Sequence, residues 1–309
     1  MKKISITVLG ILMFAAFSYG QTANEYMSLG NELYKVKKYS EAIPHYTKAI
    51  ELSPNSPEPW YNRGQSYYFL KQYESAIANF SRALQIRPAY IDALFQRGLA
   101  YNKSGKHDAA IADYSRGIEL VPNDEKFWYN RGVAFMDKND LDSALKDYDQ
   151  AIKIQPNYMK AFVNRSNVYF KKKEYDVSLV DANRVLQLDP TYVEGWGNRA
   201  VLYRTQGKLD LSIADLNKAL SLDPNYVKGY LDRAIAYNKT NRNDLAITDL
   251  NYAIKLDPKY VPAYTFRGAV YFDTKKYDLS KADMLKIQQL DPTNVFAKNI
   301  LDRIAALPK

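Results

Sequence analysis

Residues 125–158 read EKFWYNRGVAFMDKNDLDSALKDYDQAIKIQPNY, and this 34-residue stretch returns in altered form along most of the chain. Its proline belongs to a series in which each proline follows the previous one by 34 residues. The series comprises Pro54, Pro88, Pro122, Pro156, Pro190, Pro224, Pro258 and Pro292. A fixed period of this length predicts a solenoid of stacked, similar units.

Alignment on these prolines makes the repeats begin at residues 23, 57, 91, 125, 159, 193, 227 and 261, so each position can be given as a column from 1 to 34. Column 4 is mostly aromatic, and it holds all three tryptophans of the chain. Columns 8 and 20 hold only Gly, Ala or Ser. Two antiparallel helices approach closely only where the facing side chains are small. Each repeat is therefore predicted to form one helical hairpin.

These columns resemble the tetratricopeptide repeat family, which has Trp or Tyr at column 4, a small residue at 8, Tyr at 11, Ala at 20, an aromatic at 24, Ala at 27 and Pro at 32. The resemblance covers residues 23–294. It implies an all-α fold, a right-handed α-solenoid superhelix of eight 34-residue helix-turn-helix repeats. Residues 295–309 add an apolar stripe at helical spacing, which predicts a C-terminal capping helix: Ala297, Ile300, Leu301 and Ile304.

Residues 1–20 stand outside the repeats. Lys2 and Lys3 precede an apolar run over residues 4–17, and Ser18 and Gly20 lie three and one residues before Gln21. This arrangement predicts a secretory signal peptide that is cleaved after Gly20. A retained membrane anchor is the alternative, although the run is shorter than the roughly 20 residues that cross a bilayer. We expect an exported chain, periplasmic or secreted, with no integral membrane segment after cleavage.

The composition excludes several kinds of chemistry. The chain has no cysteine, and its two histidines, His45 and His107, occupy unrelated columns. Disulfides, thiolate metal sites and a histidine zinc site are thereby excluded. The sequence contains no Gly-rich phosphate loop and no nucleophile elbow. We expect no enzymatic activity, no metal and no cofactor.

Columns 7 and 23 vary together. In a hairpin, columns whose numbers sum to about 30 lie opposite each other, and repeat one, which lacks arginine at column 7, also lacks aspartate at column 23. We expect Arg–Asp pairs between the two helices in repeats three to eight, with Asn79 as the partner in repeat two. Pairing with the next repeat and presentation of the arginines to an acidic ligand are the alternatives. The expected pairs are Arg97 and Asp113, Arg131 and Asp147, Arg165 and Asp181, Arg199 and Asp215, Arg233 and Asp249, and Arg267 and Asp283.

Column 6 is rich in amides: Asn62, Gln96, Asn130, Asn164 and Asn198. The family resemblance implies that the first helix of each repeat lines a concave groove, with columns 2, 5, 6, 9, 12 and 13 facing into it. Evenly spaced asparagines can hold the backbone of an extended peptide, and this layout is similar to the asparagine ladder of O-GlcNAc transferase repeats. The alternative is that these amides cap or bridge neighbouring first helices. Columns 5 and 12 add candidate aromatic anchors: Tyr61, Phe95, Tyr129 and Tyr68.

Chaperone-binding members of the family hold a C-terminal carboxylate through five positions. These are Lys at column 5 and Asn at column 9 of one repeat, Asn at column 6 of the next, and Lys at column 2 and Arg or Lys at column 6 of the third. Repeats one to three supply Met27, Asn31, Asn62, Asp92 and Gln96 at these positions. Because the cationic members are missing, we do not expect this clamp in that register.

The formal net charge is +9, and lysines gather at the turns between the two helices of several repeats. A solvated, solubilising rim explains them, and binding of an anionic cell-envelope polymer or membrane surface is the alternative. Nucleic acid is not an expected partner of an exported chain. Self-association through the N-terminal hairpin is a further hypothesis. The lysines concerned are Lys35, Lys37, Lys38, Lys171, Lys172, Lys173, Lys275 and Lys276.

The sequence therefore predicts a non-enzymatic scaffold or assembly factor outside the cytoplasm, which binds a partner protein or an extended peptide in its concave groove.

Overall fold

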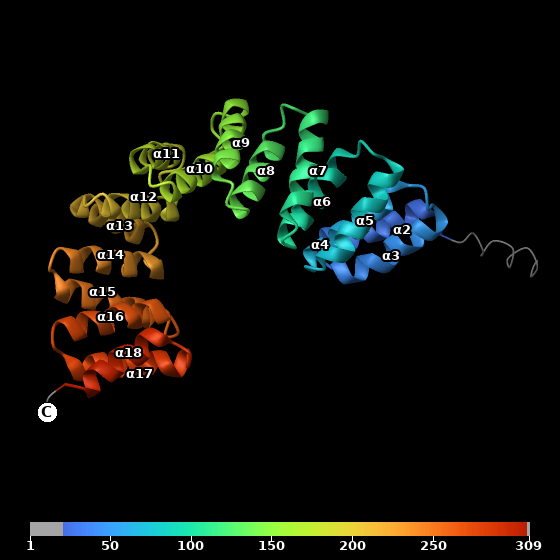
Figure 1. Ribbon diagram of the computed structural model, residues 1–309. Coiled ribbons are helices and arrows are strands. Elements are labelled where there is room, and N and C mark those ends of the chain that lie inside the picture. Colours follow the sequence, from blue (N-terminus) through green and yellow to red (C-terminus); the bar gives the residue numbers. More distant parts are fainter. Residues whose placement is uncertain (1–20, 308–309) are drawn as a thin grey trace, which may run out of the picture. The chain divides into compact units, whose positions relative to one another are not determined.

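The computed structural model describes residues 21–307, and these residues contain only helices and short turns (Figure 1). The signal peptide expected at residues 1–20 lies outside the described residues. The chain divides into two compact units, residues 1–155 and residues 156–309. Unit 1 contains α2 (Ala23–Lys35), α3 (Tyr39–Leu52), α4 (Pro57–Phe69), α5 (Tyr73–Ile86), α6 (Ile91–Lys103), α7 (His107–Leu120), α8 (Glu125–Asp137) and α9 (Leu141–Ile154).

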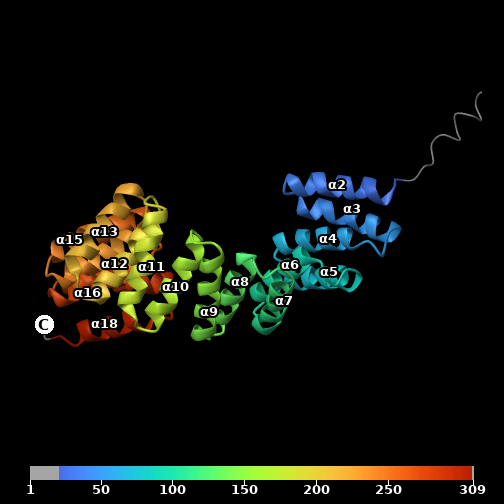
Figure 2. The same ribbon diagram turned by 90° about the horizontal axis from the view of Figure 1, so that it is seen from above.

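Unit 2 contains four further hairpins and one additional helix. Its helices are α10 (Met159–Lys171), α11 (Tyr175–Leu188), α12 (Val193–Thr205), α13 (Leu209–Leu222), α14 (Val227–Lys239), α15 (Asn243–Leu256), α16 (Val261–Asp273), α17 (Tyr277–Leu290) and α18 (Val295–Ala305). Each repeat is thus one pair of helices, as predicted, and Figure 2 shows paired helices such as α2 and α3 lying side by side.

In repeats one to four, the glycine at column 8 is required by the aromatic ring opposite it at column 24. In repeat four, a Cβ atom on Gly132 of α8 would lie 2.8 Å from Cε1 of Tyr148 in α9, and Tyr148 is fully buried. Gly98 meets Tyr114 in the same way in repeat three. A side chain at column 8 of these repeats would therefore force the two helices of the hairpin apart.

Adjacent hairpins of unit 1 pack through columns 27 and 3. At one of these contacts, a glycine at column 27 faces a phenylalanine at column 3. Repeat two has Ala83 at column 27 and repeat three has Ala93 at column 3, and both are buried in one core cluster. At the next junction, Gly117 has no side chain and Phe127 fills the space, and a Cβ atom on Gly117 would overlap the Phe127 ring. The missing side chain at Gly117 therefore makes room for the Phe127 ring.

The C-terminal helix α18 closes the end of unit 2. Ala297 and Ile300 are buried in a cluster with Tyr264, Met284 and Ile287, and Leu301 and Ile304 pack against that cluster. Asn294 caps the helix, because its side chain accepts a hydrogen bond of 3.0 Å from the backbone N–H of Ala297. The predicted capping helix is therefore present.

Column 15 lies in the left-handed region of the backbone in all eight turns between paired helices. Gly105 and Gly207 occupy it with φ of 76° in two repeats, and Asn139 and Asn241 occupy it in two others. The remaining four repeats place lysine there with φ of 59–63°: Lys37, Lys71, Lys173 and Lys275. Lysine is strained in this conformation, whereas glycine adopts it freely.

A search of residues 21–307 finds no helix with the length and apolar character needed to cross a bilayer.

Candidate functional site

The structure forms all six predicted Arg–Asp pairs as two-bonded contacts between the helices of a hairpin. In each pair the arginine Nε donates to the aspartate Oδ2 over 2.8–2.9 Å, and Nη2 donates to Oδ1 over 2.6–2.8 Å. The aspartates are 2–5% exposed. In repeat two, Arg63 Nε donates to Asn79 Oδ1 over 2.8 Å, so the amide takes the place of the carboxylate. The pairs hold each hairpin in register.

A third nitrogen of these arginines, Nη1, joins the hairpin to the preceding repeat at Arg97, Arg131, Arg199, Arg233 and Arg267. Arg199 Nη1 donates to Asn183 Oδ1 over 2.8 Å, and Arg131 Nη1 donates to Ser115 Oγ over 2.9 Å. Both acceptors lie at column 25 of the repeat before. The hydrogen bonds with Asp215 raise the pKa of Arg199, so its charge is stabilised within the pair. With Nε, Nη1 and Nη2 all engaged, the arginines have a structural role and are not open to an acidic ligand.

The asparagines of unit 1 make local hydrogen bonds. Asn62 Nδ2 donates to Oδ1 of Asn31 on the neighbouring first helix over 2.9 Å, and Asn130 Nδ2 donates to the carbonyl oxygen of Lys126 over 2.8 Å. Gln96 is half-buried and has no hydrogen-bond partner in the described part of the chain. Asn62 thus bridges two neighbouring first helices, as in the alternative that the sequence left open, whereas Asn130 bonds within its own helix.

The four candidate aromatic anchors of unit 1 are all half-buried. Tyr61 lies 5.0 Å from Tyr90 between ring centroids, and Phe95 lies 5.3 Å from Phe127. Tyr129 lies 5.9 Å from Tyr148, and Tyr68 lies 5.6 Å from Tyr73. Burial raises the pKa of the Tyr61 hydroxyl, which reflects its position against the core. Tyr129 and Tyr68 thus contact rings of their own hairpins, whereas Phe95 contacts a ring of the next repeat, and part of each side chain packs against the scaffold.

A pocket of about 140 Å³ opens in unit 2 on the first helices α10, α12 and α14. Its polar lining includes Asn167, Asn198 and Lys228, and its apolar lining includes Phe170 and Val201. Asn198 is one of the predicted column 6 residues, and it has no hydrogen-bond partner among residues 21–307. Asn164, the other predicted asparagine of unit 2, lies three residues before Asn167 on α10 and is half-buried.

A smaller cavity adjoins the pocket, since it shares Ser166, Asn167 and Asn198 with it, and Gly195 of α12 lines that cavity. Gly197, at column 5 of repeat six, makes room for Tyr226, because a Cβ atom on Gly197 would lie 2.7 Å from the hydroxyl oxygen of that tyrosine.

Charged side chains lie along the first helices of repeats six and seven. Asp232 is 6% exposed, and its Oδ1 accepts a hydrogen bond of 3.3 Å from Nη2 of Arg204. Its Oδ2 is buried without a partner among the described residues. Burial raises the pKa of Asp232, and the charges of Arg204 and Lys228 oppose that rise. Arg204 and Lys228 thus place two cations near one buried carboxylate.

The polar residues of the pocket occupy the same columns as three members of the carboxylate clamp, in a register that the sequence prediction did not test. Asn167 is at column 9 of repeat five, Asn198 at column 6 of repeat six, and Lys228 at column 2 of repeat seven. The other two clamp columns hold Val163 and Asp232 in place of cations. Asn167 and Lys228 were missed because only repeats one to three were compared with the clamp.

Within residues 21–307, no group of three or more histidine, aspartate or glutamate side chains is placed to hold a metal ion.

Family models for tetratricopeptide repeats match several parts of the chain. The model described as TPR repeat matches residues 30–71, 64–105 and 98–138. Two models described as tetratricopeptide repeat match residues 125–158 and 193–226, and residues 227–260 and 261–294. Together these ranges cover more than half of the chain. A search of curated proteins finds no match.

Solved structures show the same fold at low sequence identity. A tetratricopeptide repeat protein from Parabacteroides merdae is 19% identical, has a TM-score of 0.65, and covers 81% of this chain and 98% of its own. The C-terminal part of a TPR repeat-containing protein from Cytophaga hutchinsonii is 20% identical, has a TM-score of 0.58, and covers 89% of this chain and 99% of its own. YrrB, described as a TPR protein with an unusual peptide-binding site, is 17% identical, has a TM-score of 0.50, and covers 60% of this chain and 95% of its own.

Proposed function

Because this chain belongs to the tetratricopeptide repeat family, we propose that it is a non-enzymatic scaffold that binds an extended segment of a partner protein against the first helices of unit 2. The family fold supports a role in protein interaction. The single observation that carries the site is the pocket formed by Asn167, Asn198 and Lys228 beside Phe170 and Val201.

The chemistry of the pocket favours a peptide over a small molecule. Each asparagine side chain offers both a donor and an acceptor, which suits a peptide backbone without regard to its sequence. Lys228 supplies an ammonium group to a carboxylate of the ligand, and Phe170 and Val201 receive an apolar side chain. An extended peptide can contact all these groups if an acidic group and an apolar side chain lie within a few residues of each other.

Two variants with the same number of substitutions test this site. We expect the Asn198→Ala, Lys228→Ala double variant to lose at least about tenfold in affinity for the partner, because one hydrogen bond to the peptide and one charge contact are removed. The partner is first captured on the chain from an extract of the producing cells and identified by mass spectrometry. Tiled peptides of that protein are then titrated by fluorescence anisotropy.

The matched control is the Asn62→Ala, Asn130→Ala variant, in which the lost amides bond locally to Asn31 and Lys126. It should bind the same peptides within about twofold. Equal binding by all three proteins, or loss only in the Asn62 and Asn130 variant, would remove the pocket from the proposal.

We also propose that the protein is exported from the cytoplasm, and this proposal rests on residues 1–20. The basic start, the apolar run and the small residues before Gln21 are the features of a cleaved signal. We expect intact-mass measurement of the chain from its native cells to give a first residue of Gln21. A mass that includes residues 1–20 in a membrane fraction would favour the retained anchor instead.

A further inference from the structure

One exposed phenylalanine interrupts a polar column in unit 1. Phe69 is at column 13, which holds Lys35, Lys103, Asp137, Lys171, Thr205, Lys239 and Asp273 in the other repeats. Its side chain is 51% exposed, and Val36, in the preceding turn, is 65% exposed. Packing within the repeat does not require an apolar ring at column 13, because repeats one and three have lysine there, at Lys35 and Lys103.

Three tyrosines hold the Phe69 ring in place. The Tyr39 ring stacks on it with centroids 4.9 Å apart and planes 11° apart. Tyr34 and Tyr68 meet it edge-on, each with centroids 5.8 Å away. Burial raises the pKa of Tyr34 to about 12, so its hydroxyl stays neutral. The exposed face of Phe69 is therefore fixed at the surface by rings from two successive repeats.

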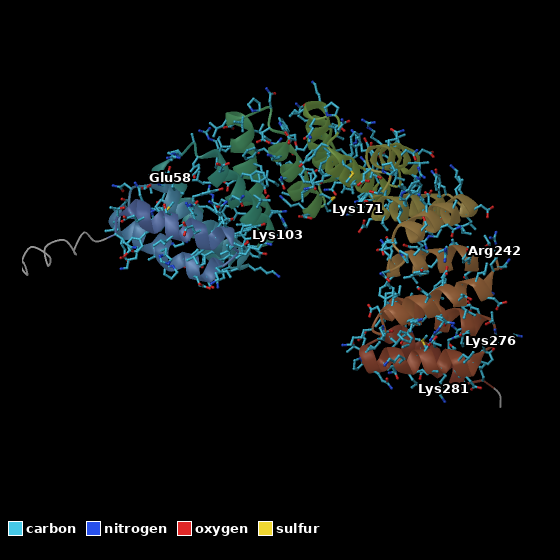
Figure 3. The ribbon with its side chains drawn as sticks, turned by 180° about the vertical axis from the view of Figure 1, so that it is seen from behind. Glu58, Lys103, Lys171, Arg242, Lys276 and Lys281 are labelled. Carbon is cyan, nitrogen blue, oxygen red and sulfur yellow. The ribbon has the colours of Figure 1, made fainter. Side chains whose placement is uncertain are left out.

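Exposed lysines stand at columns 13 and 15 of repeats one to three, on either side of Phe69 in these columns. The side chains of Lys35, Lys37, Lys71 and Lys103 have no hydrogen-bond or ion-pair partner among the described residues. Lys103 is labelled at the end of α6 in Figure 3, where its column 13 position follows that of Phe69 by one repeat. Lys37 and Lys71 have φ of 62° and 60°. Gly105 occupies the same column of repeat three, so the fold accepts glycine where these lysines stand.

We propose that this patch, composed of Phe69, Val36, Tyr34, Tyr39, Tyr68 and the four unpaired lysines, docks on a membrane surface that contains anionic phospholipid. It is a different surface from the pocket of unit 2 and does not depend on the function proposed for that pocket. Tyrosine and phenylalanine rings with adjacent lysines suit the boundary between lipid head groups and acyl chains, where rings enter the boundary and ammonium groups meet phosphates. A soluble polyanion would use the lysines and leave the exposed ring without a role.

Phe69→Lys is the most informative single substitution, because it removes the exposed ring and introduces the residue that the neighbouring repeats have at the same column, Lys35 and Lys103. The chain from Gln21 to Lys309, which retains every described residue, is sedimented with vesicles of phosphatidylcholine with or without phosphatidylglycerol. We expect wild-type binding to require phosphatidylglycerol, and Phe69→Lys to weaken it about tenfold through loss of apolar burial. Binding of the same variant to soluble polyphosphate should be unchanged or stronger, because the variant gains a positive charge.

The Lys37→Gly, Lys71→Gly variant separates charge from folding. Glycine relieves the left-handed strain at both positions, so the urea midpoint should not fall. Vesicle binding should fall by about 25-fold at low salt, from roughly fivefold for each lysine near an anionic surface. The matched control is Lys173→Gly, Lys275→Gly, which removes the same charge from the same column of unit 2 and should change binding by less than about twofold.

Three results would overturn this inference. The first is wild-type binding that does not depend on phosphatidylglycerol. The second is vesicle binding by Phe69→Lys at or above the wild-type level, which would indicate simple polyanion attraction or an acidic protein partner. The third is equal loss of binding in the two lysine variants, which would show that total charge and not this patch is responsible.

Discussion

Replacing Asp215 with alanine should lower the stability of unit 2 by about 3–5 kcal/mol, which is the usual cost of leaving a buried charge without its partner. Asp215 is 5% exposed, and it accepts two hydrogen bonds of 2.8 Å from Arg199. The side chain of Arg199 is 17% exposed, so water can replace little of the lost interaction. The measurement is urea unfolding followed by circular dichroism.

Two control variants separate loss of the buried ion pair from loss of an aspartate in general. Asp215→Asn should cost less than the alanine variant, because the amide can accept from Arg199 as Asn79 accepts from Arg63 over 2.8 Å. Asp244→Ala removes an exposed aspartate and should change stability by no more than about 1 kcal/mol. If Asp215→Ala were as mild as Asp244→Ala, the Arg–Asp pairs would not hold the hairpins together.

The junction of Gly117 and Phe127 should show strong coupling between its two residues. Gly117→Ala introduces a methyl group that overlaps the buried ring, and overpacking of this kind costs about 1–3 kcal/mol. Phe127→Ala leaves a cavity and should cost about 3–5 kcal/mol, since the ring is 1% exposed. The double variant recreates the alanine pair found at Ala83 and Ala93, so it should be more stable than Phe127→Ala alone.

A double-mutant cycle measured by urea unfolding tests the junction. We expect the double variant to cost less than the sum of the two single variants by at least about 1 kcal/mol. Additive costs would mean that the two side chains do not share one volume, and the structural account of how adjacent hairpins of unit 1 stack would then be wrong.

The sequence was sufficient to predict the fold because eight internal copies can be compared column by column. The spacing of proline and the small residues at columns 8 and 20 predict the hairpin without any other information. The Arg–Asp pairs were also predictable, since repeat one has Leu29 and His45 at the two columns and so lacks both partners together. Residues within a hairpin vary together, and a single chain with many repeats makes that variation visible.

The candidate site was less predictable because it depends on contacts between repeats. Column 6 identifies an amide but not its partner, and Asn62 bonds to a neighbouring helix whereas Asn198 lines a pocket. That pocket is lined mainly by side chains of three successive first helices, which come together only when neighbouring repeats are packed. Tyr61 and Phe95 were identified as candidate anchors, and only the packed structure shows that they are half-buried against Tyr90 and Phe127.

The aromatic patch of unit 1 illustrates the same limit. Phe69 departs from its column in a way that the sequence shows directly, but its stacking on Tyr39 requires the turn of repeat one to lie beside the end of α4. Column analysis gives the identity of such a residue, and only the packed repeats give its surroundings.

Site-specific photo-cross-linking in the cells that make this protein is the most direct test of the central claim that the first helices of unit 2 bind a partner protein. A benzophenone amino acid is placed at Val201, which lines the pocket, or at Lys218, which is exposed on the second helix α13 of the same repeat. We expect a protein cross-link from Val201 that disappears in the Asn198→Ala, Lys228→Ala background, and no such product from Lys218. Cross-links from Lys218 alone would contradict the claim and place the binding surface on the second helices.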